Sequence, residues 1–287
     1  MEAMNEKSPK HIHLSGICGT AMASLAGLLR EKGCRVTGSD AAAYPPMSDQ
    51  LREMGIPVAQ PYAAENIDST TEMVVIGNAL PAASFASAPP AVARKAGTLR
   101  VGMVARMNAR YKNHSGFLRI AKRISQNTPD VEFLLAGDGP LRNELEREAQ
   151  TLGIGDRVIF LGDRRDIPAV MASLDVAVLT SDSESLSNVI LEAMAAGLPV
   201  VAYGVGGNPE LVSSENAKLQ RGELIYAGDE AGFAAAVERL LETPSMRAQF
   251  GQNARKFAEE NFGLENVRSR YEECYRSLLE KKARKKE

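Results

Sequence analysis

Short apolar runs alternate with helix-length segments along most of the chain, and this alternation constrains the fold more than any other feature of the sequence. The runs "HIHLSG", "RVTGSD" and "MVVIGN" come first, and "LRVGMVA", "VEFLLAG", "RVIFLG", "VAVLT", "PVVAY" and "GELIYAG" follow after a gap. Strands that alternate with helices are typical of parallel sheets with crossover connections. The sequence therefore predicts an α/β fold with two Rossmann-like domains, the first abbreviated to about three parallel strands and the second complete with about six.

The expected domain boundaries follow a change in composition. Residues 79–98 are rich in Ala, Ser and Pro and have no clear periodicity, which is typical of a linker. The 287 residues are enough for two domains that each bury a core. We expect a first domain over residues 1–80, a linker over 81–98, a second domain over 99–263 and a C-terminal helix over 264–287. Four apolar side chains recur at helical spacing in this last helix and support its docking on another element: Val267, Tyr271, Tyr275 and Leu278.

Charge and composition argue against several classes of function. The net charge of −2 gives no basic field for nucleic acid or an anionic membrane. The three cysteines are scattered, so we expect reduced thiols rather than disulfides or a zinc site. No apolar run approaches the roughly 20 residues that cross a bilayer, and the polar start "MEAMNEKSPK" does not resemble a signal peptide. We therefore expect a cytoplasmic protein. Peripheral membrane contact is left open, but the sequence does not support it. The basic tail "KKARKKE" is most simply a solvated helix end.

Two glutamates flank the start of a predicted helix in the second domain. We expect Ser187 to cap this helix, Asn188 to begin it and Gly197 to end it. Glu184 precedes the helix, after the strand "VAVLT", and Glu192 lies about one and a half turns into it. Open α/β sheets bind ligands at the carboxyl ends of their strands, carboxylates bind vicinal hydroxyls, and a helix N-terminus binds phosphate. The arrangement predicts a nucleotide-sugar site; the alternative is that Glu192 is a surface residue of an amphipathic helix.

Cations and glycines are expected at the same edge of the second domain. Arg106 and Lys112 follow its first strand, where two positive charges would neutralise a leaving diphosphate; the alternative is a solvated basic loop. The turn "AGDGP" places Gly137 between a strand and a helix, and is a weak signal for nucleotide binding by itself. Gly206 and Gly207 are expected where the backbone approaches a ligand closely.

From about residue 99 to 279 the chain resembles the donor-binding domain of the retaining GT-B glycosyltransferases of family four. The resemblance rests on "VARMNARYKN", "EFLLAGDGP", "NVILEAMAAGLPVVA" and "GGNPELV", and on the glutamates Glu184 and Glu192 at the family's spacing. It implies that Arg106 and Lys112 hold the donor diphosphate, that Glu184 contacts the transferred sugar and that Glu192 binds the ribose hydroxyls. It also implies that the C-terminal helix over residues 264–287 crosses back to the first domain. The spacing from Arg106 to Lys112 is one residue longer than the commonest form, and Ser185 stands where the family often has glycine.

The first domain carries a glycine turn of its own. In "SGICGTAM", Gly16, Gly19 and Thr20 open a helix N-terminus that suits phosphate, and Asp40 ends the next strand. The alternative is tight packing of helix against strand. These residues, with "VTGSDAAAYPPMS" and "VVIGNA", resemble the N-terminal UDP-binding domain of the Mur ligases, most closely the UDP-N-acetylmuramate–murein peptide ligases. The resemblance implies that the turn meets a UDP-linked substrate and that Asp40 lies nearby. The ATP-binding tripeptide G-K-[ST] is absent from the sequence, which argues against ligase activity.

These observations lead to two main hypotheses about function. The chain is either a GT-B-type glycosyltransferase, or a chimeric or minimal version of one, that transfers a sugar from a nucleotide diphosphate donor with retention; or it is a catalytically inactive, two-domain nucleotide-binding chimera. A Mur-type ligase fragment is the weaker third hypothesis. The donor is expected to be UDP-linked, and the acceptor is not identified. No metal is expected, since Arg106 and Lys112 supply the positive charge. His11 and His13 alternate along one strand, and we interpret them as structural residues.

Overall fold

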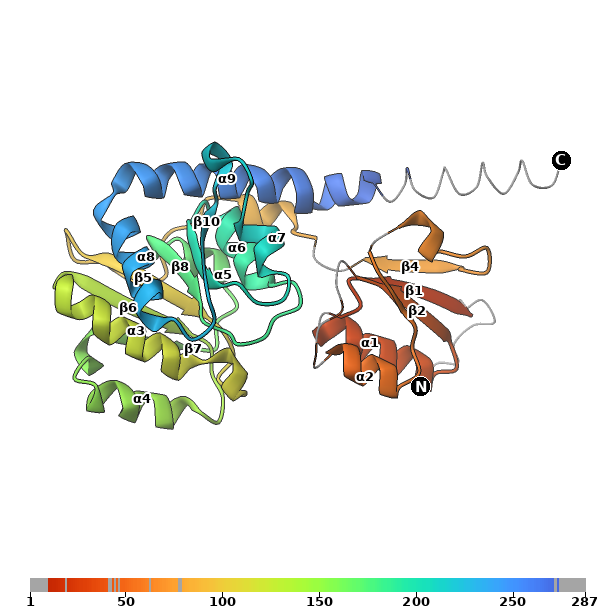
Figure 1. Ribbon diagram of the computed structural model, residues 1–287, viewed down its shortest axis with the longest axis horizontal. Helices are drawn as coiled ribbons and strands as arrows, with labels where there is room; N and C mark the ends of the chain where they lie inside the picture. Colours follow the sequence, from red (N-terminus) through yellow and green to blue (C-terminus); the bar gives the residue numbers. More distant parts are fainter. Residues whose placement is uncertain are drawn as a thin grey trace. The chain divides into compact units, whose positions relative to one another are not determined.

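The structure is a computed structural model, and it describes residues 10–18, 20–40, 43, 45, 47–61, 63–76, 79–270 and 273. The chain falls into two compact units (Figure 1). One contains the residues up to Ala79 together with those from Leu264 onward, and the other is Leu80–Gly263.

The first unit contains a four-stranded parallel sheet in the order β3-β2-β1-β4. Its strands are β1 (His11–Ser15), β2 (Arg35–Ser39), β3 (Val58–Ala59) and β4 (Met73–Ile76). Its helices are α1 (Thr20–Glu31), α2 (Met47–Glu53) and the 3₁₀ helix η1 (Ala64–Asn66). The sequence pattern predicts about three of these strands and misses β3, because two extended residues are too few to show a periodicity. The unit is therefore short, but it has a core of its own, in which Ile12 and Leu14 of β1 pack with Leu51 of α2.

The second unit is a complete doubly wound domain, as predicted. Its six strands are parallel in the order β10-β9-β8-β5-β6-β7. They are β5 (Leu99–Val104), β6 (Val131–Ala136), β7 (Val158–Gly162), β8 (Val176–Leu179), β9 (Val200–Tyr203) and β10 (Gly222–Ile225). The helices are α3 (His114–Asn127), α4 (Arg142–Thr151), α5 (Ile167–Met171), α6 (Asn188–Ala195), α7 (Asn208–Val212), α8 (Glu230–Glu242) and α9 (Pro244–Phe262). Short 3₁₀ helices join them: η2 (Ala82–Phe85), η3 (Arg110–Lys112), η4 (Gly155–Arg157) and η5 (Ala217–Leu219).

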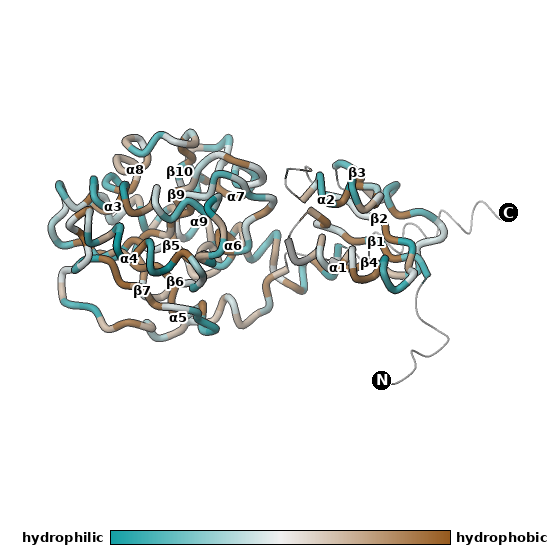
Figure 2. The backbone as a smooth tube through the Cα atoms, turned by 90° about the horizontal axis from the view of Figure 1, so that it is seen from below, coloured by the Kyte–Doolittle hydropathy of each residue, from teal (hydrophilic) through white to brown (hydrophobic). Residues whose placement is uncertain are grey.

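Helices cover both faces of this second sheet. α3 packs beside α8 on one face and α6 beside α9 on the other (Figure 1). Every residue of β8 and β9 is buried, which is why these strands are apolar throughout rather than alternating. In Figure 2 the hydrophobic colour follows β6 and β7, and the hydrophilic colour follows much of α4. The strands are thus occupied by the core, and we look for ligand-binding side chains in the loops at their ends.

Residues 81–98, expected as a linker, lie within the second unit and are fastened to β5. The Arg100 side chain, 1% exposed, donates hydrogen bonds to the backbone oxygens of Val92 at 2.9 Å and Ala93 at 2.6 Å. It also forms an ion pair with Glu132 at 2.8 Å. A buried guanidinium requires partners for its donors. Arg100 therefore holds the backbone at Val92 and Ala93 against β5.

A helical segment follows α9. Residues 264–270 are helical, and Val267 is buried. Tyr271, Tyr275 and Leu278 lie outside the described residues, so the crossing of this helix back to the first domain stays a prediction. In the described part of the chain, none of the helices has the length and apolar character needed to span a membrane.

Candidate functional site

The strand order of the second sheet creates a switch point between β5 and β8. β5 pairs with β6 on one side and with β8 on the other, so the chain leaves these neighbouring strands in opposite directions. The loop after β5 (residues 105–113) carries Arg106 and Lys112, and the loop after β8 (residues 180–187) carries Glu184. The fold therefore brings these two loops to the edge at which doubly wound domains bind ligands.

Besides the contact between Lys112 and Glu184, hydrogen bonds from three donors join the two loops. The backbone N–H of Asp182 donates to the Tyr111 oxygen at 2.7 Å, and the Thr180 hydroxyl donates to the Asn113 oxygen at 2.9 Å. The side chain of Asn113 also donates to the Asp182 carboxylate at 3.0 Å. Neither Asn113 nor Asp182 is among the residues predicted from the sequence. The one available signal was the position of Asn113 directly before a helical run, which is typical of an N-cap.

Lys112 and Glu184 form an ion pair between the joined loops. Lys112 Nζ lies 2.6 Å from Glu184 Oε1, and the two side chains are 21% and 11% exposed. The Lys112 ammonium is also 5.2 Å from the centroid of the Tyr111 ring. A charge-assisted hydrogen bond in such a shielded place is stronger than a surface ion pair. The structure therefore brings together two of the three residues expected to be catalytic.

Arg106, the third of these residues, is placed differently. It lies in the same loop as Lys112, and its side chain is exposed. Within the described residues, no hydrogen bond or ion pair engages its guanidinium. Arg106 is thus an exposed cation at the ligand-binding edge, whereas the charge of Lys112 is already paired.

The start of α6 has the expected cap. Ser187 is extended, with φ −79° and ψ 111°, and its hydroxyl accepts a hydrogen bond from the Ile190 N–H at 3.3 Å. Ser187 is buried and Asn188 is exposed. The Ser187 side chain is therefore used to begin the helix, and the exposed surface at this helix start belongs to Asn188.

Glu192 is a partly buried carboxylate on α6. Burial raises the pKa of its carboxyl above the ordinary value. Among the described residues, no donor makes a hydrogen bond or ion pair with this side chain. A desolvated carboxylate without a partner is unfavourable, which separates Glu192 from an ordinary surface residue of an amphipathic helix and makes it a candidate for a ligand contact.

Glycines allow the loops at this edge to touch each other. A Cβ on Gly137, at φ 138°, would overlap the Ala105 oxygen, and one on Gly206, at φ 54°, would overlap the Glu184 oxygen. The Gly207 N–H donates to the Ser185 oxygen at 2.6 Å. Gly206 and Gly207 thus lie against the loop that carries Glu184, and their approach to a ligand stays a prediction.

His114, the first residue of α3, is a further titratable group beside these loops, and it is not among the residues predicted from the sequence. It is 3% exposed, and its Nε2 lies 3.3 Å from the Ala105 oxygen, while Nδ1 has no partner among the described residues. Burial lowers the pKa of its imidazole, and the positive charge of Lys112 acts in the same direction. His114 is therefore a buried residue whose ring contacts the backbone of the loop after β5.

In the first unit, the glycine turn contacts the end of β2. Gly16 has φ 75°, and its N–H donates to the Ser39 oxygen at 2.8 Å. The Cys18 N–H donates to the buried Asp40 carboxylate at 2.8 Å. Gly19 and the side chain of Thr20 lie outside the described residues. The structure thus brings Gly16 and Asp40 together, with Asp40 holding the turn, and their contact with a ligand stays a prediction.

His11 and His13 belong to a hydrogen-bonded row across the same sheet. Thr37 Oγ1 lies 3.0 Å from His11 Nε2 and 2.9 Å from His13 Nδ1. The row continues from His13 Nε2 to Ser39 at 2.9 Å, and from His11 Nδ1 to Thr70 at 2.8 Å. Burial lowers the pKa of His13, and the neighbouring His11 adds to this effect. Both histidines are thus engaged by hydroxyl groups. In the described part of the chain, no three His, Cys, Asp or Glu side chains are grouped in a way that could hold a metal ion.

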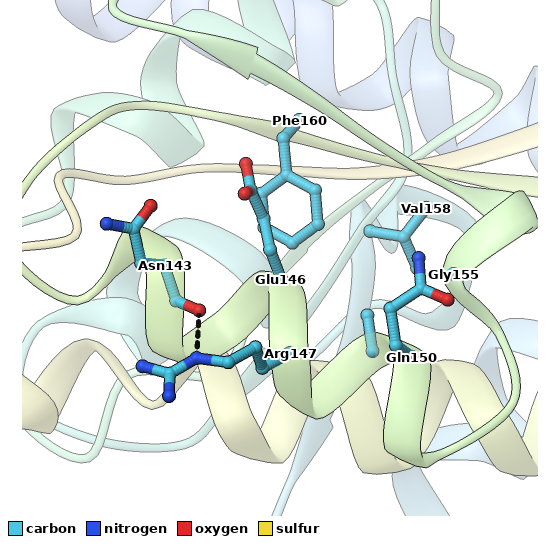
Figure 3. A pocket seen from close by; sticks show the side chains of 8 residues that line it. Asn143, Glu146, Arg147, Gln150, Gly155, Val158 and Phe160 are labelled. Atoms are coloured by element: carbon cyan, nitrogen blue, oxygen red, sulfur yellow. Dashed lines mark hydrogen bonds between the residues drawn. The ribbon is translucent and has the colours of Figure 1, made fainter.

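A separate groove of ≈ 500 Å³ lies between α4 and β7 (Figure 3). Its lining residues are Asn143, Glu146, Arg147, Ala149, Gln150, Gly155, Val158 and Phe160. None of them belongs to the predicted site, and Val158 lies at the amino end of β7, away from the ligand-binding edge. The groove is therefore not part of the candidate site.

Two family models match the chain. The family described as "Glycosyl transferases group 1" matches residues 87–257, and the one described as "Mur ligase family, catalytic domain" matches residues 11–111. The second match runs past the end of the first unit into β5 and its loop, where the two matches overlap. Residues 11–86, which include most of the first unit, therefore match the Mur ligase family alone.

Known relatives match somewhat more than half of the chain. The chain is 35% identical over 150 residues to N-acetyl-alpha-D-glucosaminyl L-malate synthase of Bacillus anthracis, covering 52% of the chain and 38% of that protein. It is 33% identical over 169 residues to 2-deoxystreptamine glucosyltransferase of Streptomyces kanamyceticus, covering 58% and 42%. The chain thus spans only about two fifths of the length of these relatives.

Solved structures share the fold. A sucrose-phosphate synthase from Thermosynechococcus elongatus aligns with a TM-score of 0.69 and 22% identity, covering 94% of the chain and 74% of that protein. Anabaena HepE in complex with UDP-glucose aligns with a TM-score of 0.62 and 20% identity, covering 93% and 99%. These likenesses confirm the predicted α/β class with two Rossmann-like sheets, the fold class of GT-B glycosyltransferases.

Proposed function

The chain belongs to the group 1 glycosyl transferases, and on that basis we propose that it binds a nucleotide diphosphate sugar at the carboxyl edge of the second sheet and transfers the sugar with retention. The observation that carries this proposal is the Lys112–Glu184 pair at the switch point between β5 and β8. The pair joins a cation and a carboxylate at the edge where doubly wound domains bind ligands, and this supports a site for a diphosphate linked to a sugar. The capped start of α6 follows directly and adds free backbone N–H groups.

Each of the four charged residues has a distinct proposed role. Arg106 and Lys112 bind the diphosphate, and their charges stabilise it as it leaves, so no metal is required for this step. An incoming diphosphate competes with Glu184 for Lys112 and frees the Glu184 carboxylate to accept hydrogen bonds from the transferred sugar. Glu192 accepts hydrogen bonds from the ribose hydroxyls, which would supply the partners that its desolvated carboxylate lacks among the described residues. Gly137, Ser187 and Asn188 are proposed to line the same site.

UDP is the proposed nucleotide. Anabaena HepE, which shares the fold, is known in complex with UDP-glucose. We also propose that the first unit derives from a Mur ligase N-terminal domain, joined near residues 77–78, and that its turn at Gly16–Thr20 and Asp40 bind a UDP-linked group. The match of residues 11–111 to the Mur ligase family supports this origin. The proposed place of action is the cytoplasm.

A second candidate function is nucleotide binding without transfer. The first sheet has four strands in the described residues, which is short for a domain that holds an acceptor. This short sheet favours a protein that binds the donor without transferring the sugar. A Mur-type ligase fragment stays the weaker third hypothesis, and the missing G-K-[ST] loop for ATP argues against ligase activity.

Thermal unfolding with UDP, GDP and their sugar conjugates tests the donor site. We expect stabilisation by a UDP-sugar, and a roughly 10- to 100-fold weaker affinity in Glu192→Ala, since a lost hydrogen bond to a charged group is worth about 1.5–3 kcal/mol. The exposed Glu242→Ala, at the end of α8, is the matched control and should bind as the wild type does. No shift with any nucleotide would sink both nucleotide hypotheses. Release of UDP in the same samples separates a transferase or hydrolase from a binder.

A further inference from the structure

Asn113 stands at the junction between the loop that carries Lys112 and helix α3. Among the described residues it alone combines a side chain with a positive φ, at φ 53° and ψ 47°. Asn adopts this left-handed conformation more readily than most residues do. Its N–H donates to the Arg110 oxygen at 2.9 Å, and its side-chain oxygen accepts from the Gly116 N–H at 2.9 Å. Asn113 therefore ends η3 and caps α3 at the same time.

The remaining polar groups of Asn113 reach across to the loop after β8. Its amide nitrogen donates to the Asp182 carboxylate, and its backbone oxygen accepts from the buried Thr180 hydroxyl. Asp182 in turn donates its own N–H to the Tyr111 oxygen. One residue thus fixes the backbone on both sides of Lys112, and ties it to a carboxylate two positions before Glu184.

From this geometry we infer that Asn113 and Asp182 are positioning residues, a clamp that holds Lys112 against Glu184 and so sets the cation at the diphosphate site. The inference rests on the proposed function for its catalytic consequence. Its structural part, that the clamp maintains the 2.6 Å ion pair, does not need a ligand.

The substitution N113D breaks the clamp with little change in shape. Asp keeps the cap oxygen and tolerates the left-handed backbone, but it places a carboxylate where an N–H donated to Asp182, so two negative charges meet. The reciprocal variant N113D/D182N restores the hydrogen bond with donor and acceptor exchanged. N127D is the matched control: Asn127 makes the same kind of bond, to Glu238 at 2.9 Å, at the far end of α3, about 20 Å away.

Two readouts decide the inference. The first is the rate of reductive methylation of Lys112, measured by peptide mass spectrometry without ligand; we expect it to rise in N113D, and to stay at the wild-type value in N113D/D182N and N127D. The second is UDP release from a UDP-sugar, where we expect N113D to lower kcat about 10- to 100-fold with a smaller change in KM, the reciprocal variant to recover, and N127D to match the wild type.

The failure of the clamp and the failure of the proposed function give different results. A wild-type protein that neither binds nor cleaves any nucleotide sugar contradicts the proposed function, while Lys112 methylation still tests the clamp. Equal methylation of Lys112 in N113D and N127D overturns the clamp. A wild-type kcat in N113D also overturns the clamp when the wild-type protein is active. So does an N113D variant that loses thermal stability but keeps the wild-type methylation rate of Lys112.

Discussion

Replacing Gly206 by alanine tests whether this glycine exists to let two loops touch. Gly206 has φ 54°, and a Cβ there would overlap the backbone oxygen of Glu184 at well under 3.0 Å, a separation that real Cβ atoms essentially never show. The obstructing atom is backbone, so no side-chain rotation can relieve the overlap, and the loop that carries Glu184 must retreat. Gly228 provides the matched control, since it has φ 86° and no atom lies within 4 Å of the position that a Cβ would occupy.

The two substitutions share one energetic cost and differ in a second. Left-handed backbone costs an L-residue about 1–2 kcal/mol, and both variants incur it. Overpacking adds about 1–3 kcal/mol in Gly206→Ala only. The expected loss of stability is therefore about 1–2 kcal/mol for Gly228→Ala and about 2–5 kcal/mol for Gly206→Ala. For a domain of this size, an excess of about 2 kcal/mol corresponds to a Tm lower by about 4–8 °C.

Thermal unfolding of the two variants side by side measures this difference. We expect Gly206→Ala also to disturb the Lys112–Glu184 pair and so to raise the methylation rate of Lys112, which Gly228→Ala should leave unchanged. Equal Tm values for the two variants would contradict this explanation of Gly206, because they would show that the loop accommodates a Cβ without strain.

Three further predictions concern charged groups. In a double-mutant cycle, Lys112→Met and Glu184→Gln should each lower stability and show a coupling of about 1–2 kcal/mol by chemical denaturation; purely additive losses would mean that the 2.6 Å contact adds nothing to stability. Burial lowers the pKa of His13, so the unfolded chain takes up a proton before the folded chain does as pH falls. The free energy of unfolding of the first unit should therefore decline below about pH 6.5, by up to about 1.4 kcal/mol per pH unit. Chemical denaturation of His13→Gln should show a weaker dependence of stability on pH, and the same dependence as in the wild type would exclude His13 as the cause. Burial raises the pKa of the Glu192 carboxyl, so UDP-sugar affinity should weaken as pH falls through that raised pKa and the carboxylate becomes protonated. Calorimetry measures this affinity, and Glu192→Gln should bind the UDP-sugar weakly at every pH. If the affinity of this variant still falls at low pH, another group is responsible.

The elements that repeat locally are the ones that the sequence predicts. The six strands of the second unit, the Ser187 cap and the separation of Glu184 and Glu192 follow from periodicity, capping chemistry and spacing within a few residues. The missed strand β3 shows the limit of this reasoning, because Val58 and Ala59 alone carry no pattern.

The contacts that assemble the site are long-range. Lys112 and Glu184 are 72 residues apart, and Asn113 and Asp182 are 69 apart. They meet because β5 and β8 are neighbours in the sheet although two other strands, β6 and β7, come between them in the chain.

Local patterns in the amino-acid chain are therefore enough to specify the α/β class and the loops that carry the charged residues, since helix and strand preferences act over a few residues. They do not specify that Lys112 is paired, that Arg106 is exposed or that Gly206 lies against the backbone of Glu184. The three-dimensional fold determines these properties. They depend on the strand order, which is set by the packing of the whole core and brings distant loops to one edge.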